Sequence, residues 1–433
     1  MIDALLNYIE FLEAKFWANI GLPFIVFCGA YLTLKTKGFQ FVTLFKVKTF
    51  FMDLVADAKT SEHGTNPIKL YFASIGGMVG VGNIVAVVSA VTIGGPGGVF
   101  WMWIASFCGM LIKYSEIYLG VTHRVRNDKG GFDGGPMYYL KKAFPNGIPS
   151  MVAAFLLSLY SIEIYQFTVV SDTVSYTMNI DKNLVVGCMI VLIFAGALGG
   201  ISRLANICTA VMPIFILVYF IISITVIYGN FSSFMAIIPE IFKSAFTGHA
   251  AIGGFAGSTF LFTAQNGIAR TVYSGDIGIG YDSIIQSDTK ARHPEKQARI
   301  AIIALFTDTT ICTLSCLVVL VTGFWCYPDM PESEMINRAF ATYIPYSEYV
   351  VMTLIFIGAL STVTGYMVVG QKCAQYLNPR FGRAVFLVLA FIAFVVFAFY
   401  EQAKILKVMS VIGGLLMICN LSGIVRLRKD LKF

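Results

Sequence analysis

The chain contains a series of windows, each about 20 residues long, that carry almost no charge. An α-helix needs roughly that many apolar residues to cross the hydrocarbon layer of a bilayer. The composition agrees, because 57% of the residues are apolar, only 13% are charged and the mean hydropathy is +0.76, values outside the range of soluble domains. We therefore predict an all-α polytopic membrane protein with about eleven crossings in a lipid bilayer, near residues 17–34, 68–93, 99–121, 151–175, 184–200, 206–228, 251–274, 299–323, 349–371, 384–400 and 405–426.

The formal net charge of +7 could indicate an anionic partner such as nucleic acid. The basic residues, however, gather on alternate predicted loops, and few fall on the other side. The positive-inside rule assigns the richer side to the cytoplasm. We expect no nucleic-acid partner and no obligate protein partner, an amino terminus outside, and a carboxyl terminus with the basic cluster Arg426–Lys432 in the cytoplasm.

The amino terminus and the cysteines add two negative expectations. Residues 1–17 carry acids where a secretory signal would carry positive charge, so no cleaved signal peptide is predicted. Most of the nine cysteines fall within predicted spans, and the histidines fall at or beyond span ends. The cysteines are interpreted as small apolar fillers, and neither a transition-metal site nor a cofactor is expected.

The second window is not an ordinary helix. Gly76, Gly77, Gly80 and Gly82 lie within seven positions and are followed by Asn83. Each glycine costs about 1 kcal/mol relative to alanine in a helix, and a bilayer tolerates unwound backbone only where it faces protein or a cavity. The alternative is close helix packing through small residues. We predict that this helix is broken.

A second interruption is predicted five crossings later. There Gly253, Gly254 and Gly257 lead into the stretch Phe262–Gly267, which contains two adjacent amides. Five helices per unit is an odd number, so two such units would lie in opposite orientations. We predict one transmembrane transporter domain over residues 1–433, in which residues 1–66 form a peripheral N-terminal helix and a cytoplasmic loop. Residues 67–229 and 250–426 form a 5+5 inverted repeat whose two broken helices indicate a secondary transporter.

Broken helices suit a zwitterion carried with a cation. Freed amide hydrogens at the start of a half-helix can hold a carboxylate, and freed carbonyls at the end of one can hold a cation. The ninth window supplies two adjacent hydroxyls, Ser361 and Thr362, in an otherwise apolar run. These hydroxyls could equally bond back to their own helix.

Several motifs resemble those of one known family. The stretch Gly94-Gly95-Pro96-Gly97-Gly98-Val99-Phe100-Trp101-Met102-Trp103, then Gly109-Met110 and Lys113, and later Gly134-Gly135-Pro136-Met137-Tyr138-Tyr139, is similar to the signature of the alanine or glycine:cation symporter family. The resemblance implies a leucine-transporter-type fold with one peripheral helix before a ten-helix core. It also implies a prokaryotic plasma (inner) membrane.

The resemblance further implies a set of site residues. The carbonyls of Gly76, Val79 and Gly358 and the hydroxyls of Ser361 and Thr362 would hold sodium, with Asn83 as a further cation ligand. A threonine is usual in the family where Met78 stands. The residues expected to contact substrate lie on three spans: Met78, Val81, Gly82, Gln166, Phe262, Thr263, Gln265 and Asn266.

Charged residues inside spans are candidates for function. Glu163 lies three residues before Gln166, on the same face, and is a candidate for gating or coupling. Lys113 and Glu116 are expected to pair along one helix. Arg270 and Asp276 are interpreted as a gate pair or a static salt bridge, and Asp308 as satisfied by its neighbouring threonines.

The function predicted is a secondary active symporter that imports a small neutral amino acid with sodium by alternating access. Alanine and glycine are the expected substrates, and D-alanine and serine stay open. The alternative is a proton-coupled permease, which Glu163 keeps open. An enzyme is disfavoured because the chain lacks HExxH, GxxxxGK[ST] and GxSxG motifs. A channel is disfavoured because nothing resembles a carbonyl filter or a ring of charge.

Overall fold

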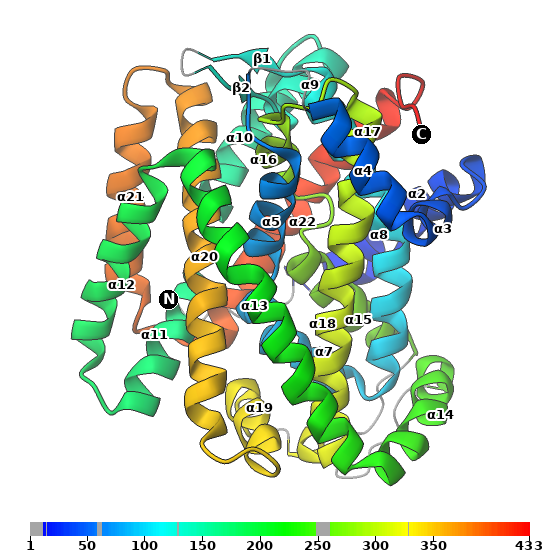
Figure 1. Ribbon diagram of the computed structural model, residues 1–433, viewed down its shortest axis with the longest axis vertical. Helices are drawn as coiled ribbons and strands as arrows, with labels where there is room; N and C mark the ends of the chain where they lie inside the picture. The colour runs from blue at the N-terminus through cyan, green and yellow to red at the C-terminus, as the bar shows by residue number, and fades with distance from the viewer. Residues whose placement is uncertain (1–11, 14, 59–62, 128–129, 248–259, 328) are drawn as a thin grey trace.

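The computed structural model describes residues 12–13, 15–58, 63–127, 130–247, 260–327 and 329–433, and these are almost entirely helical (Figure 1). The only described sheet is an antiparallel pair, β1 (Val125–Arg126) and β2 (Phe132–Asp133). The helices are η1 (Trp17–Gly21), α2 (Leu22–Lys35), α3 (Phe39–Phe45), α4 (Val47–Ala58), α5 (Pro67–Met78), α6 (Val81–Ile84), η2 (Ala86–Val88), α7 (Ser89–Gly94), α8 (Gly97–Thr122), α9 (Pro136–Ala143), α10 (Ile148–Tyr160), α11 (Ile164–Met178), α12 (Lys182–Ala197), α13 (Gly200–Gly229), α14 (Phe231–Thr247), α15 (Phe260–Gly275), α16 (Tyr281–Ser287), α17 (Pro294–Ala298), α18 (Ile300–Thr322), η3 (Phe324–Cys326), α19 (Glu332–Ala341), α20 (Ser347–Leu377), α21 (Gly382–Phe397) and α22 (Gln402–Arg426).

The number of membrane crossings can be compared with the prediction. In the described part of the chain, seven helical stretches are long and apolar enough to cross a membrane, and the bent pair α5 and α6–α7 makes an eighth. The shorter apolar helices α12 and α21 coincide with two further predicted windows, and α15 with another. Each of the predicted windows therefore contains a helix, and the all-α polytopic class is confirmed.

Helix α8 lies at the centre of the fold. It is the most enclosed of the spanning helices and packs against α2, α15, α16 and α18. The long helix α13 crosses the front of the molecule in Figure 1, and α12 and α21 form an outer flank beside α20. The hairpin β1–β2, α9, α17 and the carboxyl terminus share one end of the molecule, which we call the basic end (Figure 1). The predicted basic loops therefore meet on one side.

The first predicted break is present. Helix α5 begins with Asn66, whose side chain accepts a hydrogen bond from the Ile68 amide, and with Pro67 in its first turn, a common start signal. It ends at Met78, and the chain continues at an angle of 55° as α6 and α7. Residues Val79 and Gly80 form the break between the two halves, within the glycine cluster from which it was predicted.

The glycines from which the second break was predicted cannot be compared with the structure. Gly253, Gly254 and Gly257 lie outside the described residues, and α15 runs without interruption through Phe262–Gly267. The chain leaves the helix only after Gly275 and resumes as α16 at Tyr281. Asp276, Gly278 and Gly280 between them have φ angles of 51°, 80° and 95°, a left-handed conformation that ends a helix. The paired amides Gln265 and Asn266 are thus helical.

A third interruption was not predicted. The window near 151–175 consists of two helices, α10 and α11, separated by Ser161, Ile162 and Glu163. Glu163 has a φ of 52° and occupies the N-cap position of α11. No glycine or proline marks this point in the sequence, so the usual signal of a helix boundary is missing here.

Candidate functional site

The first break packs directly against α20. The hydroxyl of Thr362 donates to the carbonyl oxygen of Gly76 over 3.0 Å, and that of Ser361 donates to the carbonyl of Gly358 over 2.8 Å. A Cβ atom on Gly358 would lie 2.9 Å from the Cα of Gly80. The two backbones are therefore in contact, and this contact requires glycine. Thr362 joins the broken helix to α20, whereas Ser361 bonds within its own helix.

Three oxygen atoms converge beside Gly80. A Cβ atom built on this residue would lie 2.7 Å from Oε1 of Gln166, 2.7 Å from Oγ1 of Thr362 and 3.2 Å from the carbonyl oxygen of Gly358. Oε1 of Gln166 is buried and has no hydrogen-bond partner among the described residues. A buried oxygen without a donor is costly, and clustered oxygens are the ligands that hard cations prefer.

The structure brings together the residues predicted for sodium, and it adds one. Gly76, Val79, Gly358, Ser361 and Thr362 all lie at this contact between the break and α20. Gln166 was assigned to substrate by the resemblance, but its oxygen lies beside those of Thr362 and Gly358. Its position could not be predicted from the sequence, because it depends on where the interruption after Tyr160 directs α11.

Asn83 lies next to the break and has other partners. Its Oδ1 accepts from the Gly80 amide over 3.1 Å, and its Nδ2 donates to Asp308 over 2.5 Å. The expectation that neighbouring threonines satisfy Asp308 is wrong. The hydroxyls of Thr307, Thr309 and Thr310 bond to carbonyls of their own helix, so Asn83 links α6 to α18 through this buried carboxylate.

The predicted substrate residues fall into two groups. Met78, Val81 and Gly82 lie at the break, and a Cβ on Gly82 would be 3.5 Å from the Cα of Ser274 at the end of α15. Thr263, near the start of α15, donates instead to the carbonyl of Gly94 at the far end of α7. A helix rise of 1.5 Å per residue separates Thr263 from Ser274 by about 16 Å.

The first turns of α15 also contain the other residues of that second group. Asn266 donates to the carbonyl of Phe262 in its own helix over 2.9 Å, and Gln265 is partly buried. The structure therefore does not bring Phe262, Thr263, Gln265 and Asn266 to the break. It places Tyr273 and Ser274 there, and the glycines at 275, 278 and 280 are the signal that could have located this end of the helix.

Lys113 has partners other than the predicted one. Its ammonium lies 2.6 Å from Oδ2 of Asp282, 2.6 Å from the carbonyl of Gly275 and 2.8 Å from the sulfur of Met78, and its side chain is fully buried. The expected pair with Glu116 is wrong, because the lysine reaches across to the interruption between α15 and α16. A cation at the carboxyl ends of α5 and α15 is favourable, and the sulfur of Met78 contributes to holding it.

The expected pair of Arg270 and Asp276 is not formed in the structure. Asp276 accepts a hydrogen bond from the hydroxyl of Tyr366 on α20. Nε and Nη1 of Arg270 are buried and have no hydrogen-bond partner among the described residues. The two residues lie on either side of the end of α15, and the left-handed backbone at Asp276 turns its carboxylate toward α20 instead.

One tyrosine closes the site on the side of the basic end. The ring of Tyr281 fills a slot between α5 and α20, where Cβ atoms on Gly77 and Gly365 would lie 2.3 Å and 2.5 Å from its hydroxyl oxygen. That hydroxyl donates to the carbonyl of Ala73 over 3.3 Å. Since Gly365 follows Thr362 by about one helical turn, the ring lies one turn from the oxygen cluster.

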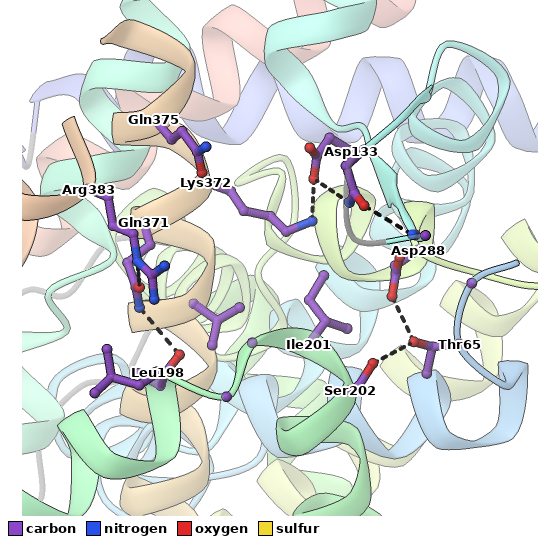
Figure 2. Close-up of a pocket in the computed structure, with 18 of the residues that line it drawn as sticks. Thr65, Asp133, Leu198, Ile201, Ser202, Asp288, Gln371, Lys372, Gln375 and Arg383 are labelled. Atoms are coloured by element: carbon purple, nitrogen blue, oxygen red, sulfur yellow. Dashed lines mark hydrogen bonds and ion pairs between the residues drawn. The ribbon is translucent and has the colours of Figure 1, made fainter. Parts of the chain in front are cut away.

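Beyond Tyr281 lies a polar cavity of about 490 Å³ (Figure 2). Val368, about one further turn along α20, lines it together with residues from the starts of α5 and α13 and from the β hairpin. An ion pair of 2.6 Å between Lys372 and Asp133 crosses it, and Thr65 donates to Asp288 over 2.7 Å (Figure 2). Oxygen cluster, tyrosine and cavity follow one another along α20.

The fold and the site define the class of the protein. A bundle of spanning helices, a helix broken at buried oxygens and a polar cavity leading from that break are the features of a secondary transporter. The sodium:alanine symporter family model matches residues 2–432. The chain belongs to the sodium:alanine symporter family, and it is a transporter and not an enzyme.

Individual relatives agree with this assignment. The chain is 30% identical over 429 residues to an uncharacterized transporter of Haemophilus influenzae, covering 94% of this chain and 91% of the relative. It is 28% identical to the sodium/alanine symporter AgcS of Methanococcus maripaludis, with 95% and 92% covered. The crystal structure of MhsT in complex with L-phenylalanine matches with a TM-score of 0.62 at 13% identity, covering 86% and 93%. The fold is therefore the leucine-transporter fold.

Proposed function

We propose that this protein imports a small neutral amino acid together with Na⁺. The observation that carries the proposal is the convergence of the oxygens of Gln166, Thr362 and Gly358 beside Gly80. Buried oxygens at a helix break, one of which has no donor among the residues that the structure describes, suit a cation. The similarity to a sodium/alanine symporter supports Na⁺ and alanine. Glycine, D-alanine and serine belong to the same substrate class.

The substrate site proposed is the other side of the same break. The amides at the start of α6, around Val81 and Gly82, are free to hold a carboxylate because no helical turn precedes them. Met78 and the end of α15, at Tyr273 and Ser274, enclose this region. Close backbone contacts at Gly80 and Gly82 leave space for a small side chain only, which supports alanine or glycine over larger amino acids.

In this proposal transport proceeds by alternating access. Na⁺ binding joins α5 to α20 through Thr362, and the completed site then binds the amino acid more tightly, so coupling is a difference in affinity between states. We propose that the basic end faces the cytoplasm of a prokaryotic cell. Movement of Tyr281 then connects the site to the polar cavity, through which both ligands leave.

The test is uptake of radiolabelled alanine and glycine into proteoliposomes with and without an inward Na⁺ gradient. The double variant Ser361→Ala/Thr362→Ala should lose Na⁺-dependent uptake. Thr353→Ala is the matched control, since this hydroxyl on the same helix is exposed and bonds only to the carbonyl of Tyr349. If uptake by the wild-type protein is the same with and without Na⁺, the proposal is contradicted.

Coupling to protons is the second candidate, and one observation favours it. Glu163 is a buried carboxylate close to the oxygen cluster. If protons drive transport, an imposed pH gradient without Na⁺ supports uptake, and Glu163→Gln abolishes that uptake. The same proteoliposomes therefore distinguish the two ions.

A further inference from the structure

Glu163 is a buried acid without a cationic partner. Its side chain is 1% exposed, and it takes part in no ion pair within the described parts of the chain. Burying a charge is expensive unless an opposite charge accompanies it. Two other buried acids near the interrupted helices have different partners: Asp282 pairs with Lys113, and Asp308 accepts a hydrogen bond from Asn83. Like Asp308, Glu163 has no cationic partner among the described residues, and its polar neighbours are Gln166 and the hydroxyl of Tyr273.

The backbone at Glu163 adds a second observation. The residue adopts a left-handed conformation with a φ of 52°, which is uncommon for a residue other than glycine or asparagine. Such strain persists where the surroundings impose it, and it is concentrated at functional sites. The conformation places the carboxylate at the start of α11, beside Gln166 and the hydroxyl of Tyr273, which donates to it over 3.3 Å.

The contact with Gln166 determines which way that amide points. Glu163 at the N-cap and Gln166 three residues later are neighbours in the first turn of α11, and because an ionised carboxylate only accepts hydrogen bonds, Gln166 would offer its NH₂ group to Glu163. The amide oxygen then points the opposite way, toward Gly80 and the oxygens of Thr362 and Gly358. Glu163 is thus connected to the oxygen cluster by one side chain, whose dipole is oriented with its negative end toward the cluster.

We propose that Glu163 provides the negative charge that balances the transported cation, acting through Gln166. This inference rests on the proposed function. It adds a negative charge close to the three oxygens of the cluster, which are neutral. A nearby cation supplies the positive charge that allows the buried carboxylate to be ionised. One nearby carboxylate suits a cation of one positive charge. Glu163 is a positioning residue here, because Gln166 and not Glu163 contacts the ion.

The experiment measures Na⁺ binding directly, as the Na⁺ concentration that half-maximally raises the melting temperature of the purified protein, with choline chloride holding ionic strength constant. Glu163→Gln should raise this concentration about tenfold or more, because the balancing charge is lost at short range in a medium of low dielectric constant. Gln166→Glu in the same chain moves the charge to the oxygen cluster itself, and the double variant should recover most of the affinity.

Three controls separate the possible outcomes. Asp172→Asn removes an acid of the same helix, partly exposed and paired with Lys182, and should leave Na⁺ binding unchanged. If Glu163→Gln fails to fold, Glu163→Asn keeps a residue that tolerates the left-handed backbone and removes the charge. Unchanged Na⁺ affinity in these variants, or no recovery in the double variant, overturns this inference alone. Absence of any Na⁺ effect on the wild-type protein overturns the proposed function.

Discussion

The ammonium of Lys113 lies 2.6 Å from a carboxylate oxygen of Asp282, and both side chains are buried. The same ammonium contacts Met78 and Gly275, the last residues of the two helices that end near the middle of the fold. One cation thus holds α5, α15 and α16 against α8. The ends of the interrupted helices are therefore held together by the Lys113 side chain, without a transported ion.

Removing one member of the Lys113–Asp282 pair should therefore lower the stability of the protein strongly. Lys113→Met leaves Asp282 buried and unpaired, and we expect a loss of stability of about 3–5 kcal/mol, measured as a lower melting temperature in detergent. Adding Asp282→Asn should recover part of it. Lys182→Met, which breaks the more exposed pair with Asp172, should cost less than about 1 kcal/mol. Equal melting temperatures for the two lysine variants would contradict the role given to Lys113.

Thr362 should govern Na⁺ affinity. Thr362→Val keeps the shape but removes the hydroxyl oxygen that lies at the cluster, and we expect the Na⁺ concentration for half-maximal uptake to rise about tenfold or more. Thr362→Ser should stay close to wild type because it keeps the oxygen. Thr353→Val on the same helix is the matched control. An unchanged Na⁺ dependence in Thr362→Val would exclude this hydroxyl as a ligand.

A methyl group at Gly80 should block the site. The new carbon would lie 2.7 Å from two oxygens, and overpacking of this size costs about 1–3 kcal/mol. Gly80→Ala is expected to lower Na⁺-dependent alanine uptake at least about tenfold while the protein remains in the membrane. Gly187→Ala is the control, because nothing lies within 4 Å of its added carbon. Normal uptake by Gly80→Ala would mean that the oxygens at this point do not bind the ion.

Cys326 can test which way the protein faces. It is exposed and belongs to η3, which precedes α19 in the chain, and α19 lies at the end of the molecule opposite the basic end (Figure 1). A membrane-impermeant maleimide should therefore label it in intact cells and not label Cys326→Ser. Partial burial raises the pKa of the Cys326 thiol. The thiolate is the reactive form, so the labelling rate should increase as the pH rises from 7 to about 9. Labelling only in inverted vesicles would reverse the proposed orientation.

The sequence was sufficient for the fold class and the first break. Long uncharged windows allow few structures in a bilayer, and the glycine cluster at 76–82 predicted the break, although Gly76 and Gly77 also allow close packing against Cys208 and Tyr281. The interruption after Gly275 was not predicted, because Gly278 and Gly280 follow an acid and are typical of a loop outside the membrane. The inverted repeat over 67–229 and 250–426 stays a prediction.

The site itself was only partly predictable. The adjacent hydroxyls of Ser361 and Thr362 are visible in the sequence, but their position beside the first break was implied only by the resemblance to the symporter family. The partners of Lys113, Asp276 and Asp308 lie more than sixty residues away in sequence or on other helices, and short-range spacing rules cannot find them. Glu163 was identified as a charged residue within a span, but no glycine or proline beside it signals its left-handed backbone.

The slot that holds Tyr281 connects the proposed exit path to a short helix. The phenol ring, which lies between Gly77 and Gly365, comes after the oxygen cluster and before the cavity of about 490 Å³ along α20. The ring belongs to the first residue of a seven-residue helix that follows three left-handed residues. Withdrawing the ring from its slot therefore needs movement of this short helix only, and the helices α5 and α20 that form the slot can stay in place along the proposed path.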